Sequence, residues 1–309
     1  MSGTTSLREY RSPPSTSKNV RFWQRKSVRR LVHAVVVYSL LIGIGILILM
    51  PLSWMLTAAL RARGEPVYTL PVSWFPTESF HFENFATVLF NDAYPLWRPL
   101  LNTLMLVVLN IIGVVFSNTL VAYAFARLDF PLKEFLFKLV ILTMLMPGVV
   151  LFIPSFLLFN VLGWYGTYLP LWVPSFFGSA FNIFITRQYM RSFPRDLDDA
   201  AMIDGCNRLG IYWRIILPLS RPVITVMTVF TFQGVWNDFT GPLIYLNDPS
   251  KFTLAVALNY FRQSTFTGQV STTNLVMAAA LMSTIPMLIL YFFFQKQLIG
   301  GIASVGIKG

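Results

Sequence analysis

Long apolar stretches separated by short polar ones run along most of the chain. Residues 31–60 and 99–126 contain no formally charged side chain, and residues 139–186 form an uncharged stretch of 48 residues. A helix needs about 20 apolar residues to cross a bilayer, so the longest stretch predicts two membrane spans. Gly163 and Gly166 mark the turn between these two, within residues 160–167. The pattern predicts six spans, over residues 32–59, 99–126, 139–159, 168–187, 222–246 and 274–295.

The composition agrees with an all-α, polytopic membrane helix bundle. Hydrophobic residues make up 55% of the 309 residues and charged residues only 12%, whereas a soluble domain carries about 25% charged residues. A soluble globular fold would therefore lack the polar side chains that cover its surface. The first apolar stretch is too long for the apolar region of a signal peptide, and no small-residue cleavage site follows it. We expect it to be retained as a membrane span.

Basic residues are concentrated in alternate loops, which predicts the orientation of the chain. With the N-terminus inside, the cytoplasmic segments contain 19 of the 24 Lys and Arg residues, so the positive-inside rule places both termini in the cytoplasm. This distribution also accounts for the net charge of +11, because anionic inner-leaflet lipids attract basic loops. No nucleic-acid-binding motif accompanies the charge. Residues 1–30 are predicted to be a basic, disordered cytoplasmic tail.

The sequence offers no nucleotide-binding, metal-binding or catalytic motif. Gly-x-x-x-x-Gly-Lys-Ser/Thr is absent and no Gly-Lys pair occurs, so we expect no ATPase site in this chain. The single cysteine, Cys206, excludes an internal disulfide and a thiolate cluster. The two histidines, His33 and His81, lie far apart and lack metal-ligand spacing. We therefore predict no catalytic residue, no metal site and no cofactor bound by this chain.

One acidic residue falls inside a predicted span. Asp238 belongs to the sequence Trp236-Asn237-Asp238-Phe239 in the outer half of span five, where a charge is costly and often functional. Trp236, Asn237 and Asp238 are therefore candidates for a translocation path or gate. The alternative is an acid that is wetted at the interface or held by neighbouring donors.

The polar segment 188–221 between spans four and five predicts two short helices. Residues 192–196 are typical of a helix start, and Asp196, Asp198 and Asp199 suit the positive end of the helix dipole. Gly205 is expected to end this helix in a left-handed conformation. A second, amphipathic helix over 207–217 is expected to end at Pro218 and to place five residues largely together, namely Leu209, Tyr212, Trp213, Ile216 and Leu217. By residue type alone, this segment also fits a helix that lies on the membrane surface.

Residues 199–218 closely resemble the Glu-Ala-Ala loop of the membrane subunits of binding-protein-dependent ABC importers. In that loop Glu-Ala-Ala is followed three residues later by Gly, and later by Leu-Pro. Here Asp199-Ala200-Ala201 matches the triplet, Asp204-Gly205 the glycine, and Leu217-Pro218 the end. From about residue 31 onward the chain is similar to the carbohydrate-uptake branch, represented by the second, six-span permease of the maltose transporter. The supporting matches are residues 127–131, Met146-Pro147-Gly148, residues 187–194, 236–239 and 300–309.

The resemblance implies a type I importer permease whose loop, over residues 196–218, is a coupling helix docked in a cleft on an ATP-binding subunit. Asp199 would replace the family's Glu, which is thought to meet a basic residue on the ATPase, with a side chain one methylene shorter. Gly205 would permit the tight elbow, and the end of the chain, residues 306–309, would reach towards the ATPase dimer. ATP-driven closure of that dimer would then produce alternating access.

The resemblance also implies a set of partners. These are a homologous permease, two ATP-binding subunits that bind ATP and Mg, an extracytoplasmic solute-binding protein and membrane lipid. The location would be a bacterial or archaeal cytoplasmic (inner) membrane. The solute would be a carbohydrate or sugar-like compound, whose identity the sequence leaves open.

Two other classes of function remain as alternatives. An ion- or proton-coupled carrier or channel would need no ATPase, and the scarcity of ionisable residues inside the spans counts against it. A membrane-embedded enzyme would need a polar catalytic cluster near one face, and the sequence shows none.

Overall fold

A computed structural model describes residues 26–67, 73–76, 79–90, 95–266 and 273–306. The chain divides into two units, Met1–Trp54 and Met55–Gly309. Within the described ranges every regular element is helical. The elements are α1 (Lys26–Ala59), α2 (Glu83–Phe90), α3 (Trp97–Arg127), α4 (Lys133–Thr143), α5 (Gly148–Val161), α6 (Leu169–Trp172), η2 (Val173–Phe177), α7 (Ala180–Arg191), α8 (Asp196–Ile203), α9 (Arg208–Ile211), η3 (Tyr212–Ile216), α10 (Leu217–Leu219), α11 (Arg221–Asn237), α12 (Thr240–Tyr245), η4 (Pro249–Lys251), α13 (Leu254–Phe266) and α14 (Thr273–Gly306).

Helix lengths and hydropathy confirm the all-α membrane character. In the described part of the chain four helical stretches are long and apolar enough to cross a membrane, namely Arg30–Ala59, Trp97–Arg127, Leu169–Arg191 and Thr273–Gln297. Two further pairs pass the same test together but are bent, α4 with α5 by 97° and Arg208–Leu219 with α11 by 74°. If each bent pair is one broken span, the total reaches the six that the sequence predicts.

The helices differ from the predicted spans and loops in several places. Span three, expected over 139–159, is two helices with a sharp bend at residues 144–147, because Pro147 lacks the N–H that would continue α4. The range expected for span five is interrupted at Asp238 and Phe239. Helix α14 continues to Gly306, but its membrane-spanning stretch, Thr273–Gln297, agrees with the span predicted over 274–295. The segments between predicted spans one and two and between predicted spans five and six contain the helices α2 and α13. Residues 26–30 of the predicted disordered tail are helical, and residues 1–25 lie outside the described ranges.

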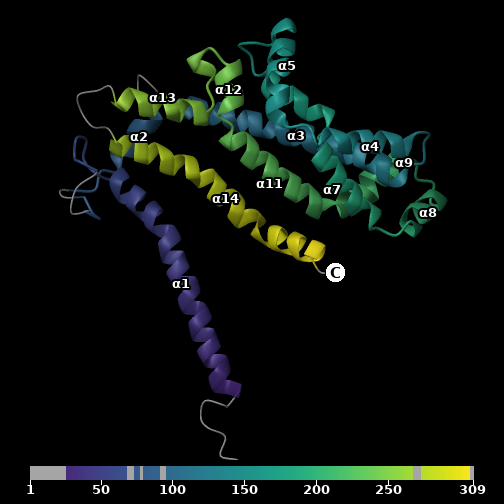
Figure 1. Ribbon diagram of the computed structural model, residues 1–309, viewed down its shortest axis with the longest axis horizontal. Coiled ribbons are helices and arrows are strands. Elements are labelled where there is room, and N and C mark those ends of the chain that lie inside the picture. The colour runs from purple at the N-terminus through teal and green to yellow at the C-terminus, as the bar shows by residue number, and fades with distance from the viewer. Residues whose placement is uncertain (1–25, 68–72, 77–78, 91–94, 267–272, 307–309) are drawn as a thin grey trace, which may run out of the picture. The chain divides into compact units, whose positions relative to one another are not determined.

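Helix α3 is the centre of the second unit. It packs against α7 and α11, and α11 packs in turn against α14 (Figure 1). Polar side chains on α3 bind backbone groups of the irregular segment α6–η2–α7, which lets that segment depart from a regular helix in an apolar environment. These hydrogen bonds join Asn110 Nδ2 to Leu171 O at 2.9 Å, Ser117 Oγ to Ser175 O at 3.0 Å, and Ser179 N to Asn118 Oδ1 at 2.7 Å. The hydropathy pattern alone did not reveal this row of polar residues.

Close packing of α3 on η2 requires a glycine at position 113. A Cβ atom on Gly113 would overlap Ser175 Oγ and lie 2.6 Å from Phe176 Cδ2. We expect Gly113→Ala to lower the free energy of unfolding by about 1–3 kcal/mol through overpacking, measured by thermal denaturation in detergent. The matched control is Gly234→Ala in α11, where a Cβ would meet nothing within 4 Å. Equal melting temperatures for the two variants would contradict the packing argument.

Candidate functional site

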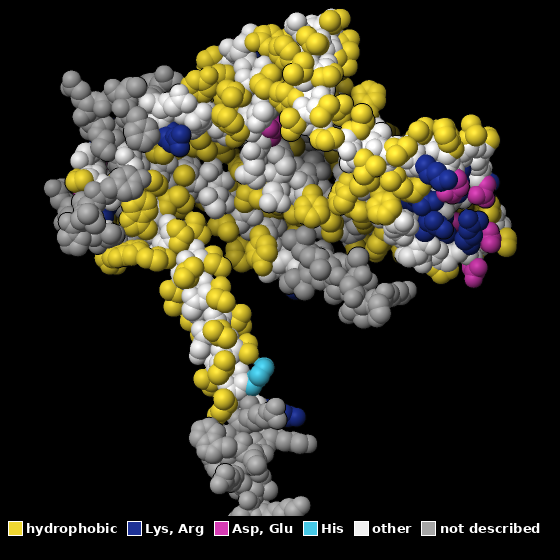
Figure 2. All heavy atoms as spheres, viewed as in Figure 1, with side chains coloured by type: hydrophobic (Ala, Val, Ile, Leu, Met, Phe, Trp, Pro, Cys, Tyr) yellow, Lys and Arg dark blue, Asp and Glu magenta, His cyan; other side chains and the backbone are white. Residues whose placement is uncertain are grey.

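The polar segment after α7 folds as a knob of two short helical arms, defined here as residues 196–219. The first arm is α8, and the second is the continuous run α9–η3–α10. In Figure 1 both arms lie at one end of the second unit, near α4 and α7. Figure 2 shows Lys, Arg, Asp and Glu side chains gathered at this end, next to a predominantly apolar surface. The knob is therefore part of a polar end of the molecule.

Gly205 forms the corner between the two arms, as the sequence predicts. Its φ is +79°, a left-handed conformation that glycine adopts without steric cost. The Gly205 N–H donates to Met202 O at 3.0 Å, and the Cys206 N–H donates to Ala201 O at 2.9 Å. These two bonds make a Schellman motif, which satisfies the last carbonyl groups of α8. Asn207 Oδ1 then accepts the Gly210 N–H at 2.7 Å and caps the start of α9.

A buried base holds the knob on the ends of α3 and α7. One hydrophobic cluster joins Ala122, Tyr123 and Ala126 of α3, Met190 of α7, and Ala201, Ile211, Tyr212 and Ile216 of the knob. Two hydroxyl groups extend this contact. The Tyr212 hydroxyl lies 2.8 Å from Thr119 Oγ1, and the Tyr123 hydroxyl donates to Arg208 O at 2.8 Å. The second arm is therefore fixed to α3 by both apolar and polar contacts.

Arg127, at the end of α3, holds the first arm. Its side chain is 3% exposed, and its guanidinium lies 3.2 Å from Asp198 Oδ2, whose side chain is 16% exposed. It also donates to Phe193 O at 3.0 Å and to Pro194 O at 3.5 Å. Burial raises the pKa of the Asp198 carboxyl, and the nearby Arg127 charge opposes that rise. Removing Arg127 would leave this half-buried carboxylate without its cation.

The predicted coupling residues divide into an exposed tip and a buried base. Asp199, Ala200, Asp204 and Gly205 are exposed, whereas Ala201 is buried. Two apolar side chains join the exposed group, Met202 at 46% and Ile203 at 87%. The tip of α8 therefore presents two carboxylates and two apolar side chains to its surroundings.

The second arm differs from its predicted form. Leu217 is partly buried, and Pro218 lies inside the helical run, which ends at Leu219 rather than at Pro218. Leu209 and Trp213 are exposed, and Ile211 is buried in their place. The buried positions are those that pack against α3 and α7 in the cluster with Ala122, Tyr123 and Met190, so tertiary contacts set the buried face of this arm.

Trp236, Asn237 and Asp238 lie away from the knob, at the break between α11 and α12. Trp236 is 4% exposed, and its Nε1 donates to Ser283 O at 3.0 Å. Asp238 Oδ1 accepts the Gly241 N–H at 3.1 Å at the start of α12. This contact agrees with the alternative interpretation of Asp238, in which neighbouring donors hold the acid. Asn237 is exposed and lines a cavity together with residues of α13 and α14. Among the described residues, no group of three His, Cys, Asp or Glu side chains could hold a metal ion.

Sequence reasoning missed the residues that anchor the knob, above all Thr119, Tyr123 and Arg127. Arg127 was noted only as part of a matching segment, although an arginine at the end of an apolar span was a usable signal. Thr119 and Tyr123 gave no signal, because their partners, Tyr212 and Arg208, are more than 80 residues away in sequence.

Comparison with known proteins agrees with this architecture. The family described as "Binding-protein-dependent transport system inner membrane component" matches residues 118–303. The chain is 29% identical over 286 residues to the arabinooligosaccharides transport system permease protein AraQ of Halalkalibacterium halodurans, which covers 91% of this chain and 100% of the relative. It is 30% identical to the osmoprotective compounds uptake permease protein GgtD of Synechocystis, over 95% of this chain and 96% of the relative.

A solved structure shares the fold. It is a bacterial ABC transporter involved in the import of the acidic polysaccharide alginate, and its matching chain superposes with a TM-score of 0.74 at 23% identity, over 88% of this chain and 97% of that chain. The fold is thus that of a type I importer permease. The family match spans more than half of the residues, and the chain belongs to the family of binding-protein-dependent transport system inner membrane components.

Proposed function

We propose that this chain is the permease subunit of an ATP-driven importer for a carbohydrate or sugar-like solute, and that the knob couples it to an ATP-binding subunit. Family membership supports an inner-membrane location, a partner permease and an external solute-binding protein. The names of relatives support a saccharide as the solute. AraQ is named for arabinooligosaccharides, and another relative, the permease protein YtcP of Bacillus subtilis, is named for polygalacturonan and rhamnogalacturonan. ATP and Mg would be bound by the two partner ATPase subunits, because this chain lacks a phosphate-binding loop.

The observation that carries the coupling role is an exposed tip on a rigid base. Ile203, 87% exposed, and Met202 stand beside Asp199 and Asp204 at the corner of the knob. Behind them Ala201 and Tyr212 are buried against α3. Apolar side chains ringed by charge are typical of a protein-binding surface. A partner that presses on this tip would therefore move α3 with it.

The test is uptake by the assembled transporter. The chain would be co-expressed with its partner permease and the ATP-binding subunit, purified as a complex, reconstituted in liposomes and supplied with the binding protein. Uptake of labelled oligosaccharide is expected only with ATP inside and with all subunits present. Uptake that persists without ATP or without the ATPase subunit would support an independent carrier instead and would overturn the proposal.

Asp199 is predicted to contribute a charged contact to this docking. Asp199→Asn is expected to reduce retention of the ATPase subunit on the purified chain by about twofold to fivefold, the size of an exposed ion pair. Asp199→Glu is expected to retain the contact. Asp129→Asn serves as the control, because Asp129 is also an exposed carboxylate, 79% exposed, but lies outside the knob. Equal losses for Asp199→Asn and Asp129→Asn would show that only general surface charge matters.

A further inference from the structure

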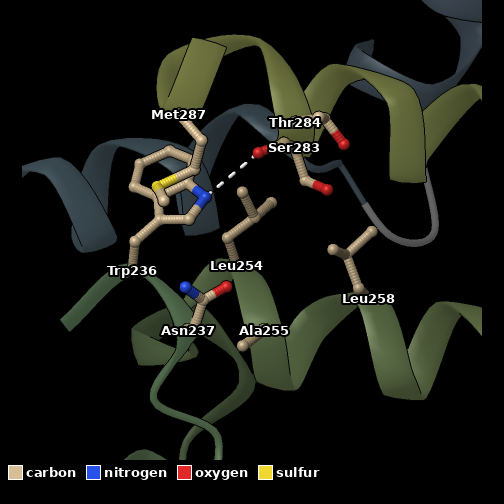
Figure 3. A pocket seen from close by; sticks show the side chains of 8 residues that line it. All are labelled: Trp236, Asn237, Leu254, Ala255, Leu258, Ser283, Thr284 and Met287. Carbon is tan, nitrogen blue, oxygen red and sulfur yellow. Dashed lines mark hydrogen bonds between the residues drawn. The ribbon is translucent and has the colours of Figure 1, made fainter. Parts of the chain in front are cut away.

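A cavity of about 280 Å³ lies where three helices meet, away from the knob. Its lining comes from the end of α11, the start of α13 and the middle of α14 (Figure 3). The residues that line it are Trp236, Asn237, Leu254, Ala255, Leu258, Ser283, Thr284 and Met287. Helix α11 ends beside the cavity, and breaks in membrane helices are tolerated where they line protein or water-filled space.

One wall of the cavity is rigid. Trp236 stacks on Phe232 with ring centroids 5.4 Å apart. Its Nε1 donates to Ser283 O at 3.0 Å (Figure 3). Trp236 and Leu254 are both buried in one hydrophobic cluster, and Met287 packs against it. This wall therefore needs no rearrangement to receive a ligand, which reduces the entropy lost on binding.

The polar groups in the cavity are nearly all acceptors. Ser283 Oγ and Thr284 Oγ1 both donate to Ala280 O, at 2.7 and 2.9 Å, and Asn237 Nδ2 donates to Gln233 O at 2.9 Å. Their donor capacity is thus used largely within their own helices. The oxygen atoms Ser283 Oγ, Thr284 Oγ1 and Asn237 Oδ1 accept no hydrogen bond from the described part of the chain, and each can accept one from a ligand.

The lining also lacks charge. None of the eight residues is ionisable, and the neighbouring Asp238 caps α12 rather than lining the cavity. A ligand that fits must therefore bring hydroxyl donors and an apolar face but no charge. A carboxylate would meet acceptor oxygens and no cation. No contact in the cavity would then offset the cost of desolvating the carboxylate.

We propose that this cavity is a solute-binding subsite on the translocation path that accepts one neutral sugar ring or polyol, and that it disfavours uronic acid units. Hydroxyl groups of the solute would donate to Asn237, Ser283 and Thr284, while C–H faces would contact Leu254, Leu258 and Met287. A volume just below the roughly 300–1,000 Å³ typical of small-molecule sites suits a single ring. The subsite rests on the proposed import function and adds a contribution of this chain to solute selection.

The test uses the complete importer in liposomes with saturating binding protein and three labelled trisaccharides, namely arabinotriose, maltotriose and trigalacturonate. A neutral trisaccharide is expected to be taken up in preference to trigalacturonate. Asn237→Leu and the double variant Ser283→Ala/Thr284→Val are each expected to slow uptake of the neutral sugar by about threefold to tenfold, the effect of one or two lost hydrogen bonds. ATPase retention is expected to stay unchanged, since these residues lie far from the knob.

The matched control is Thr228→Val in α11. Thr228 Oγ1 also donates to a carbonyl four residues earlier, Ile224 O at 2.9 Å, but the residue does not line the cavity. Asn237→Lys supplies a cation at an exposed position and is expected to shift relative uptake towards trigalacturonate. Cavity variants that transport like Thr228→Val, or a native importer that prefers trigalacturonate, would overturn the subsite. If the native complex takes up none of the three and no other saccharide that its binding protein binds, the proposed import of carbohydrate fails instead.

Discussion

Gly205→Glu is expected to abolish ATP-driven uptake while the chain still inserts and folds. Within the chain the change is tolerated sterically, because a Cβ on Gly205 would meet nothing within 4 Å. The local cost is that of a left-handed backbone at φ +79°, about 1–2 kcal/mol. At the docking surface the same side chain would place bulk and an unpaired charge beside Ile203, where a partner must approach. Uptake, ATPase retention and yield of folded chain are the measurements.

Asparagine at the same position separates backbone strain from docking. Asparagine tolerates left-handed backbone better than other non-glycine residues, and it is shorter and uncharged. Gly205→Asn is therefore expected to keep a substantial part of the uptake that Gly205→Glu loses. Normal ATP-driven uptake by Gly205→Glu would falsify the coupling role of the knob. A collapse in folded yield would instead indicate a structural role for Gly205.

Arg127→Met is expected to detach the first arm of the knob from α3. Breaking a buried ion pair from one side costs about 3–5 kcal/mol, and the partial exposure of Asp198 argues for the lower end of that range. The change also removes the donor to Phe193 O. We expect a lower melting temperature, faster proteolysis at the knob, and a large fall in uptake. These effects would appear even though Arg127 is 3% exposed and has no place at the docking tip.

Two variants make this prediction specific. Asp198→Asn in the Arg127→Met background removes the stranded charge and is expected to recover part of the lost stability. Arg195→Met is the control, because the Arg195 side chain is 66% exposed and its guanidinium lies 4.0 Å from the exposed Asp129. Such a pair is worth about 0–1 kcal/mol. If Arg195→Met destabilises the chain as much as Arg127→Met, burial of the Arg127 ion pair is not the cause.

The parts of this structure that depend on local chemistry could be predicted from sequence. The uncharged stretches predicted α1, α3 and α14. Burying a charge in lipid is costly, so membrane spans have few charged residues. The acidic first turn of α8 and the glycine at its end gave the corner of the knob, because caps involve only near neighbours. The resemblance of the Asp199–Pro218 segment to a known loop supplied the family, which its match over residues 118–303 then confirmed.

The parts that depend on distant partners could not be predicted. Arg127 and Asp198 meet across 71 residues of sequence, and the polar stripe of α3 is explained only by the carbonyl groups of α6 and η2. Packing against α3 and α7 buries Ile211 and leaves Leu209 exposed, which a helical-face argument from the segment alone did not anticipate. Asp238 was a candidate for the translocation path because an acid inside a predicted span is costly. In the structure its carboxylate accepts the Gly241 N–H and caps α12.

The polar contacts of α3 connect the knob to the cavity, so α3 can transmit a movement from one to the other. A helix of 31 residues is roughly 46 Å long, and its Arg127 end carries the knob. Near its opposite end, Thr103 Oγ1 accepts the N–H of Leu254, which lines the cavity. A tilt of about 5° at the knob would move the far end by roughly 4 Å, by the length of the helix alone. That displacement exceeds the reach of a hydrogen bond, so small movements at one end are enough to open or close contacts with a solute at the other.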